Sequence, residues 1–265
     1  MSGEETHVAV AGSEVLGEGV YGEVSRCACA PGCSYVIKTW SGDDDGEERE
    51  SELGIQERLP ASPHLLRGAR SGEGMVMRYL EPVREVPLAQ ALRDVMTGIA
   101  ALARCGIAHC DLKVDNLGRD PETGAVVIYD FGNALDFADP NPKHSKKLKY
   151  RCTLYTRPPE TYVHRRSDVW SGALAAVEAS YGHSFLVRFI YGRKPLGDMF
   201  AELSEEPGTL EALRLALRED PEERADAEGV LAALHRPCLP REEVSTKKRK
   251  LLSGAEFLDS AVGVR

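Results

Sequence analysis

Three polar side chains in two nearby stretches are of the types required for phosphoryl transfer from a magnesium-bound nucleotide. Asp111 and Asn116 lie in the polar octapeptide 109–116, and Asp130 opens the tripeptide Asp-Phe-Gly. In this chemistry a carboxylate orients the attacking hydroxyl, while an amide and a second carboxylate hold the metal on the phosphates. These residue types and their spacing predict one site that draws ligands from both stretches.

The elements around these residues explain how they can meet. Residues 106–108 end a helical pattern, the octapeptide is a polar loop, and residues 125–129 form a short apolar strand that runs directly into Asp130. Apolar runs of this length bounded by turn residues are typical of buried strands. Two loops flanked by strands can therefore bring three oxygen-bearing side chains to one place.

A glycine-rich stretch near the N-terminus predicts a hairpin. Apolar residues alternate on either side of Gly17, Gly19 and Gly22, and glycines let backbone N–H groups close over phosphate oxygens. This spacing also occurs in dinucleotide-binding units, but those need a helix immediately after the third glycine. Residues 23–27 continue as a strand, which favours a lid over phosphates.

The octapeptide His-Cys-Asp-Leu-Lys-Val-Asp-Asn, followed by Asp-Phe-Gly, resembles the catalytic loop and metal loop of the eukaryotic protein kinase family, serine/threonine type. The resemblance covers about residues 14–236 and implies a two-lobed α+β kinase fold. A protein kinase domain is expected over residues 13–240, with a small β-rich N-lobe (about 13–80) and a larger, mainly helical C-lobe (about 83–240). Residues 1–12 would form a leader and residues 241–265 a basic tail. The compact size and a poor match over residues 182–210 resemble kinases encoded by large DNA viruses.

The resemblance implies transfer of the γ-phosphoryl group of ATP to hydroxyl groups of protein substrates. Asp111 would orient the substrate hydroxyl, and Lys113 would neutralise charge on the transferred group. Asn116 and Asp130 would carry Mg²⁺, with Mn²⁺ as an alternative. Lys113, together with Thr153 ahead of a Pro-Pro-Glu sequence, resembles serine/threonine rather than tyrosine kinases.

Nucleotide binding is implied by the same resemblance. Lys38, which ends an apolar strand, would contact the α- and β-phosphates and needs a carboxylate partner. Glu52 shares a helical face with Ile55 and Leu59, so we predict Glu52 as the partner and keep Glu48 as the alternative. The other residues implied lie in the glycine-rich stretch and in the hinge that would pair with adenine: Gly17, Glu18, Gly19, Tyr21, Gly22, Val24, Met77, Tyr79 and Leu80.

Supporting contacts are also implied by the family pattern. His109 would support the metal loop structurally, and Asp168 would brace the backbone of the catalytic loop. The chain beyond Gly132 resembles an activation segment that ends at Glu160, which would pair with Arg224.

Cys110 departs from the family pattern. Most kinases regulated through the activation segment have an arginine here, which pairs with a phosphorylated residue of that segment. A cysteine cannot supply a bidentate cation. We therefore expect activity without activation-segment phosphorylation. The basic stretch 143–151 lies where a protein substrate would dock.

Bulk properties narrow the class of protein. The chain has 265 residues and a net charge of −9, so it lacks the basic footprint of a nucleic-acid binder. It also lacks an apolar stretch of membrane-span length and the apolar core of a signal peptide. ATP and protein substrates are the expected partners, without nucleic acid or membrane, and a monomer is expected. The expected location is intracellular, in the cytoplasm or the nucleus, with Lys247, Lys248, Arg249 and Lys250 as a weak import signal.

The seven cysteines are expected to be reduced thiols, because the chain has no export signal. Cys27, Cys29 and Cys33 cluster around a predicted hairpin turn and invite comparison with a zinc site. A fourth ligand at metal spacing is missing, which favours thiols in a hairpin.

Two alternatives to an active protein kinase remain open. A pseudokinase scaffold would have lost the lysine, the asparagine or the Asp-Phe-Gly sequence, and all three are present here. Kinase-fold phosphotransferases for small molecules usually lack the Asp-Leu-Lys loop together with a Pro-Pro-Glu segment and an Asp-x-Trp sequence, and this chain has all of these.

Overall fold

The computed structural model describes residues 14–19, 22–27, 33–40, 46–72, 74–138, 147 and 151–235. The chain divides into two units, Met1–His235 and Arg236–Arg265, and every described residue belongs to the first. The predicted leader, Tyr21, Cys29 and the basic tail lie outside the described residues.

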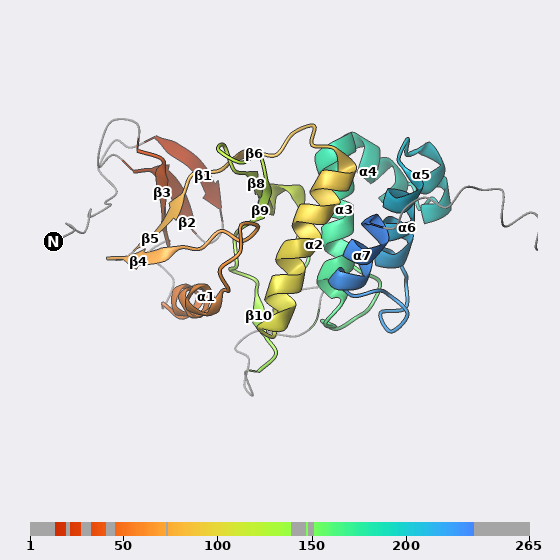
Figure 1. Cartoon of the computed structure of the whole chain (residues 1–265). Coiled ribbons are helices and arrows are strands. Elements are labelled where there is room, and N and C mark those ends of the chain that lie inside the picture. Colours follow the sequence, from red (N-terminus) through yellow and green to blue (C-terminus); the bar gives the residue numbers. More distant parts are fainter. Residues whose placement is uncertain are drawn as a thin grey trace, which may run out of the picture. The chain divides into compact units, whose positions relative to one another are not determined.

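An antiparallel five-stranded sheet forms the N-terminal part of the first unit, in the order β1-β2-β3-β5-β4 (Figure 1). The predicted glycine-rich hairpin is confirmed as two paired strands, and the most apolar runs form the inner strands. The bounds are β1 (Val15–Gly19), β2 (Gly22–Arg26), β3 (Tyr35–Thr39), β4 (Ala69–Ser71) and β5 (Gly74–Arg78). The helix α1 (Glu47–Arg58) links β3 to β4 and contacts β4.

The C-terminal part of this unit is helical (Figure 1). Apolar residues at helical spacing over residues 88–103 predict a helix, and α2 confirms it, with Leu92, Val95, Ile99 and Leu102 all buried. The helices are α2 (Leu88–Arg104), α3 (Ser167–Tyr181), α4 (His183–Ile190), α5 (Leu196–Glu202), α6 (Pro207–Ala216) and α7 (Ala227–Leu234). The stretch that fits the family pattern poorly, 182–210, contains α4, α5 and the start of α6. A sheet-rich N-terminal part and a helical C-terminal part confirm the predicted α+β arrangement.

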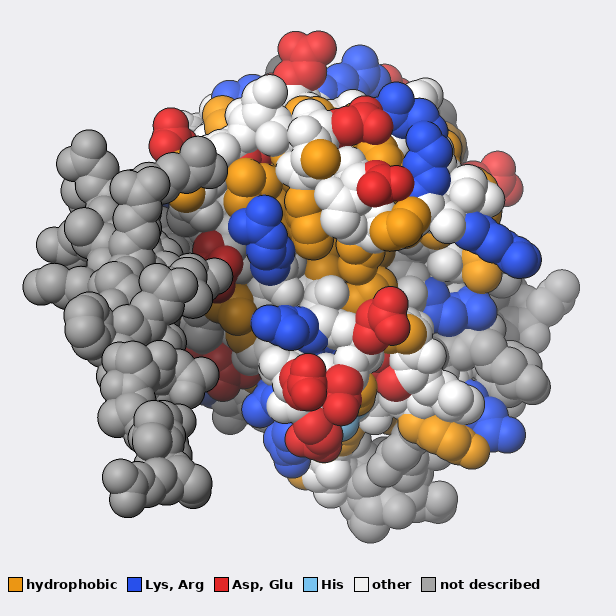
Figure 2. Space-filling model, turned by 90° about the vertical axis from the view of Figure 1, so that its right-hand side faces the viewer, with side chains coloured by type: hydrophobic (Ala, Val, Ile, Leu, Met, Phe, Trp, Pro, Cys, Tyr) orange, Lys and Arg blue, Asp and Glu red, His pale blue; other side chains and the backbone are white. Residues whose placement is uncertain are grey.

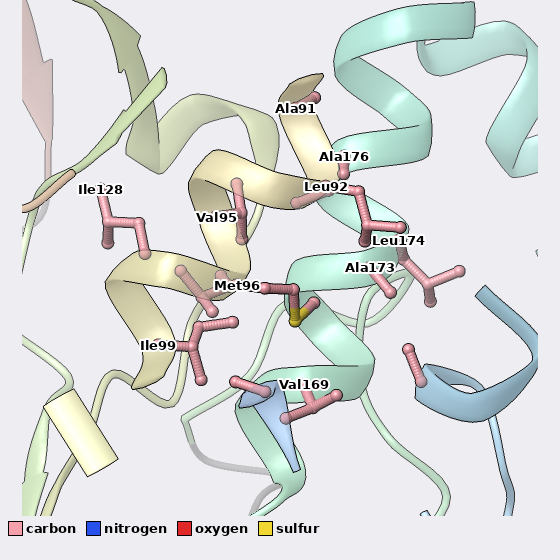
Figure 3. Packing of buried hydrophobic residues seen from close by; sticks show 14 of the residues in the cluster. Ala91, Leu92, Val95, Met96, Ile99, Ile128, Val169, Ala173, Leu174 and Ala176 are labelled. Atoms are coloured by element: carbon pink, nitrogen blue, oxygen red, sulfur yellow. The ribbon is translucent and has the colours of Figure 1, made fainter. Parts of the chain in front are cut away.

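The packing of α2 against α3 forms the centre of the core. Figure 3 shows Met96 of α2 directed toward α3, where Val169 and Ala173 lie. A Cβ atom at Gly172 of α3 would lie 2.6 Å from Cδ1 of Ile99. A larger residue at this position would therefore force the side chains of Ile99 and Val95 to shift, so Gly172 favours the close approach of the two helices.

Short paired strands hold the two predicted loops at both ends. The loop 109–116 runs from β7 (Ile107–Ala108) through the 3₁₀ turn η1 (Val114–Asn116) into β8 (Leu117–Arg119). The loop that begins at Asp130 runs from β9 (Val126–Ile128) to β10 (Leu135–Asp136). Since β7 pairs with β10 and β8 pairs with β9, the two loops lie side by side.

Two contacts join the sheet to the helical part near the hinge. Arg78, the last residue of β5, donates from Nη1 to Oδ2 of Asp120 at 2.8 Å. A Cβ atom at Gly118 would lie 2.6 Å from Cβ of Leu80, so the hinge packs tightly over β8. The strand β6 (Glu81–Pro82) then pairs with β8 and continues the connection toward α2.

The face of the helical end in Figure 2 carries a band of hydrophobic side chains, with Lys or Arg and Asp or Glu intermixed around it. No stretch of one charge sign dominates this face. None of the helices in the described ranges combines the length and hydrophobicity that a membrane span requires.

Candidate active site

Lys38 lies at the centre of a cluster of charged groups. Its Nζ donates to Oε1 and Oε2 of Glu52 at 2.8 Å and 2.7 Å, and to Oδ1 of Asp130 at 3.1 Å. The predicted pairing of Lys38 with Glu52 is therefore present. Glu52 is buried with Ile55 and Leu59 on the inner face of α1, whereas the side chain of Glu48 lies outside the described residues.

The three charges of this cluster depend on one another. Burial opposes the charge on Lys38, but the nearby carboxylates of Glu52 and Asp130 outweigh it and raise the pKa of Lys38. Burial would raise the pKa of Asp130, but Lys38 outweighs it, so the pKa of Asp130 is lowered. Burial raises the pKa of Glu52 more than Lys38 lowers it. The side chain of Asp130 is 37% exposed, so it remains reachable by a ligand.

Asp111 is held in place by Thr153, a residue of the activation segment. Oδ1 of Asp111 accepts hydrogen bonds from the backbone N–H of Thr153 at 2.8 Å and from its hydroxyl at 2.7 Å. Oδ2 of Asp111 lies 3.4 Å from Nζ of Lys113. One carboxylate oxygen is therefore used for orientation, and the other faces a cation.

Asn116 forms a hydrogen bond within the catalytic loop and still offers its side-chain oxygen as a ligand atom. Its Nδ2 donates to the backbone carbonyl of Asp111 at 2.8 Å, which leaves its Oδ1 as the atom available to a cation. Its backbone carbonyl accepts from the N–H of Tyr129, the residue before Asp130, at 3.0 Å. The two loops that carry the predicted metal ligands are thus joined by a direct hydrogen bond.

The available donors fit a hard divalent cation. Asp130 and Asn116 offer oxygen atoms, which Mg²⁺ prefers, and Mg²⁺ is commonly bound through one or two protein ligands plus phosphates. Among the described residues, no group of three or more His, Cys, Asp and Glu side chains could hold a metal by itself. A cation here would therefore need phosphate oxygens from a nucleotide to complete its coordination.

His109 acts as a structural support. Its ring accepts from the backbone N–H of Asp111 at Nδ1 (3.3 Å), so Nε2 carries the proton that is donated to the carbonyl of Tyr129 (2.9 Å). The ring also packs on Phe131, with 5.1 Å between centroids. His109 is fully buried, which favours the predicted structural role over acid–base chemistry.

Two residues of the site adopt strained backbone conformations. Cys110 has φ 68° and Asp130 has φ 63°, in the left-handed region that costs a non-glycine residue about 1–3 kcal/mol. At Cys110 the strain is offset by Asp168 of α3, whose carboxylate accepts from the N–H of His109 at 2.6 Å and of Cys110 at 2.9 Å. This is the predicted bracing of the catalytic loop.

The end of the activation segment is anchored by a buried ion pair. Arg224 is fully buried, and its Nη1 and Nη2 each donate to a carboxylate oxygen of Glu160 at 2.8 Å. Ser167, at the start of α3, also donates to Glu160 at 2.7 Å. The predicted pairing of Glu160 with Arg224 is present.

The glycine-rich strands and the hinge have the following arrangement. Gly19 pairs with Gly22, and a Cβ atom at Gly22 (φ 138°) would lie 1.9 Å from the carbonyl of Thr39, so only glycine fits there. Val24 lies opposite Lys38 in the sheet register. Gly17 and Glu18 are exposed on β1.

In the hinge region, Met77 is buried in β5, and Tyr79 and Leu80 are half-buried. The N–H of Tyr79 donates to the carbonyl of Ser34 at 2.7 Å. This N–H is therefore used within the protein and is not available to a nucleotide.

Arg151 and Cys152 were not predicted as site residues. Arg151, expected in a basic docking surface, is only 6% exposed, so that expectation is wrong for this residue. Its guanidinium donates to the carbonyl of Asn133 at 2.5 Å, and the thiol of Cys152 lies 2.7 Å from the carbonyl of Cys110. No periodic pattern links residue 133 to residue 151, or residue 110 to residue 152, so nothing in the sequence signals these contacts.

Comparisons with known proteins agree with this geometry. Residues 71–188 match the family model described as protein kinase domain. The chain is similar to protein kinase gsk3 of Schizosaccharomyces pombe, with 34% identity over 38% of this chain and 26% of the relative. It is also similar to cyclin-dependent kinase B2-1 of Arabidopsis thaliana, with 29% identity over 60% of this chain and 61% of the relative. A third relative is the serine/threonine-protein kinase ste20 of Aspergillus oryzae, with 30% identity over 59% of this chain and 21% of the relative.

The matched regions thus span less than two thirds of the length of these relatives. The match to the family model includes the catalytic loop and the Asp-Phe-Gly loop, because both lie within residues 71–188. The same two loops carry Asp111, Asn116 and Asp130 in the geometry described above. The chain therefore resembles eukaryotic protein kinases over residues 71–188, the region that carries both loops.

Proposed function

We propose that the protein is a serine/threonine kinase that transfers the γ-phosphoryl group of ATP to hydroxyl groups of protein substrates. The observation that carries this proposal is the contact of Lys38 with both Glu52 and Asp130. It unites the expected nucleotide-binding lysine and the expected metal ligand in one cluster. The proposed kinase domain spans residues 13–240, and the proposed location is intracellular.

Asp111 is the proposed group that orients the substrate hydroxyl. Since Thr153 occupies Oδ1 with two hydrogen bonds, Oδ2 is the oxygen that remains to accept a hydrogen bond from the substrate. Lys113, 3.4 Å from the same oxygen, would stabilise negative charge that develops on the transferred group. Placement and charge stabilisation supply most of the acceleration in this class of reaction.

Lys38 is the proposed ligand of the α- and β-phosphates, and Glu52 holds its ammonium in place. Asp130 and Asn116 are the proposed ligands of Mg²⁺. The bound cation would neutralise charge on the phosphates. Because Lys38 already contacts Asp130, the lysine and the metal ligand would bind neighbouring phosphate oxygens.

The preference for serine and threonine is supported by the hydroxyl of Thr153. It bonds directly to Asp111 and so ties the activation segment to the group that receives the substrate. The relative named serine/threonine-protein kinase ste20 agrees with this assignment.

The test is radiolabel transfer from γ-labelled ATP with Mg²⁺ to generic protein acceptors, followed by analysis of the labelled amino acid. Wild type should label serine or threonine, and both Asp130→Asn and Lys38→Met should abolish the label. Transfer to tyrosine alone would contradict the assigned type. Absence of transfer, together with partner binding that does not depend on nucleotide, would support a scaffold instead.

A further inference from the structure

Three consecutive residues of the activation segment each bond to the loops of the proposed active site. Arg151 donates from Nη1 to the carbonyl of Asn133 at 2.5 Å. Cys152 donates from its thiol to the carbonyl of Cys110 at 2.7 Å. Thr153 bonds to Oδ1 of Asp111 through both its N–H and its hydroxyl. We call residues 151–153 the strap.

Arg151 is the charged member of the strap, and it is buried. Only 6% of the residue is exposed. A buried guanidinium is costly unless it is hydrogen-bonded, so its burial indicates that the contact with Asn133 is maintained. A lysine or arginine that served only solubility or docking would keep its charged end in water.

The carbonyl that Arg151 contacts belongs to the metal loop. Asn133 follows the Asp-Phe-Gly sequence in a turn, where the N–H of Ala134 donates to the carbonyl of Phe131 at 3.0 Å. Arg151 therefore links the activation segment to the loop that carries Asp130. Its neighbour Thr153 links the same segment to Asp111. The strap spans both halves of the proposed site.

Cys110 places no charge of its own beside Arg151. Burial raises the pKa of the Cys110 thiol well above its ordinary value, and the charge of Arg151 lowers it only in part. Cys110 is therefore a neutral thiol beside the guanidinium. An arginine at position 110, as the family pattern has, would place a like charge next to Arg151.

We propose that Arg151 is a positioning residue for the phosphoryl transfer proposed above: it holds the activation segment against the metal loop and so keeps Thr153 on Asp111 without a phosphate on the segment. The cation that orders the segment lies on the segment itself and not at position 110. A phosphate on the segment is then not needed as the partner of that cation. This inference rests on the proposed function, and it also makes a structural claim that can be tested without activity.

The test compares the full chain with Arg151→Met, which keeps length and loses every donor, and with Arg151→Lys, which keeps the charge. The matched control is Arg104→Met, because Arg104 forms an exposed ion pair with Glu228. All proteins are treated with phosphatase, and mass spectrometry verifies that phosphate is absent. Hydrogen exchange is then measured at the backbone amide of Thr153, which bonds to Asp111.

We expect exchange at the Thr153 amide to be at least about 10-fold faster in Arg151→Met, with the control unchanged and Arg151→Lys in between. In the transfer assay, kcat should fall about 10- to 100-fold in Arg151→Met, which corresponds to the loss of one hydrogen bond to a charged group. The KM for ATP should stay within about twofold, since Lys38 is untouched. The effect on kcat should not add to that of Thr153→Ala, because both act through Asp111.

Unchanged exchange at Thr153 in Arg151→Met would overturn the proposal, as would a wild type that loses most of its activity on phosphatase treatment. If Arg151→Met does not fold, Arg151→Lys decides: exchange equal to that of the control overturns the proposal. If wild type transfers no phosphate but Arg151→Met still exchanges faster at Thr153, the proposed function fails and the role of Arg151 in holding the segment stands.

Discussion

The ammonium nitrogen of Lys38 lies 3.1 Å from Oδ1 of Asp130, although the two residues are 92 positions apart in the chain. Lys38 belongs to the central part of the sheet, and Asp130 begins the loop after β9. This contact therefore aligns the sheet with the loops of the helical part. The other functional contacts can be judged by how they support this alignment.

Replacing Lys38 with methionine should affect activity and stability by separate routes. Transfer should be lost, and Glu52, which is 2% exposed, would become a buried carboxylate without its partner, at a cost of about 3–5 kcal/mol. The double variant Lys38→Met with Glu52→Leu should regain stability and stay inactive. Chemical denaturation and the transfer assay measure the two effects. Glu57→Leu on the exposed face of α1 is the control, and a double variant no more stable than Lys38→Met would contradict this account.

For kcat, the hydroxyl group of Thr153 should matter more than the shape of the Thr153 side chain. Thr153→Val keeps the volume but removes the hydrogen bond to Asp111, so kcat should fall about tenfold. Thr153→Ser keeps the hydroxyl and should stay close to wild type. Steady-state kinetics with a generic protein acceptor measures both. Equal rates for the valine and serine variants would show that the hydroxyl does not orient Asp111.

An arginine introduced at position 110 should be harmful, although the family pattern has an arginine there. Cys110→Arg places a second guanidinium beside buried Arg151, and charge repulsion and overpacking should cost at least about 2 kcal/mol. Cys110→Ser, a small neutral replacement, serves as the control. The double variant Cys110→Arg with Arg151→Cys should recover part of the loss, because one cation then remains. Unfolding midpoints measure each step, and a fully stable Cys110→Arg protein would contradict the prediction.

The ion pair of Glu160 with Arg224 should make stability depend on pH in a defined direction. Burial would raise the pKa of Glu160, but hydrogen bonds from Arg224 and Ser167 outweigh it and lower the pKa. A lowered pKa in the folded state means that the stabilisation is complete above the ordinary glutamate pKa of about 4.3 and is lost as the pH falls through the lower, folded-state pKa.

Glu160→Gln should therefore be less stable than wild type near neutral pH, with a difference that shrinks as the pH falls below about 4. Urea unfolding at several pH values measures this difference. Arg224→Met, which leaves the carboxylate without its guanidinium partner, should cost about 3–5 kcal/mol at neutral pH. A difference between wild type and Glu160→Gln that grows on acidification would contradict the assignment.

Local sequence patterns were sufficient to predict the helices and strands around the site and the proximity of the loop 109–116 to the loop that begins at Asp130. The spacing of Leu92, Val95 and Ile99 predicted α2, and the spacing of Ile55 and Leu59 from Glu52 selected the partner of Lys38. Both rest on a helical period, which the sequence displays directly. The pairing of Glu160 with Arg224 has no such period and came only from the family resemblance.

The strap could not be predicted, because it joins irregular segments whose contacts depend on the finished fold. Arg151 sits in a basic stretch, and a basic stretch is normally a solvated surface, so its burial contradicts the local pattern. Likewise, only the folded structure shows that the N–H of Tyr79 is already bonded to the carbonyl of Ser34, just beyond the paired strands.

The ion pair of Arg78 with Asp120 bears on the release of ADP in the proposed kinase, because it joins the hinge to the turn after β8. Asp120 is fixed, because its Oδ1 accepts from the N–H groups of Glu122 and Thr123, whereas the side chain of Arg78 is 47% exposed. Only the arginine end of the pair reaches water, because the side chain of Asp120 is 5% exposed, so dissolved ions screen this pair in part. If the proposed kinase is limited by release of ADP, its turnover should rise modestly with ionic strength, because Arg78 is the end of this ion pair that can detach while Asp120 stays in place.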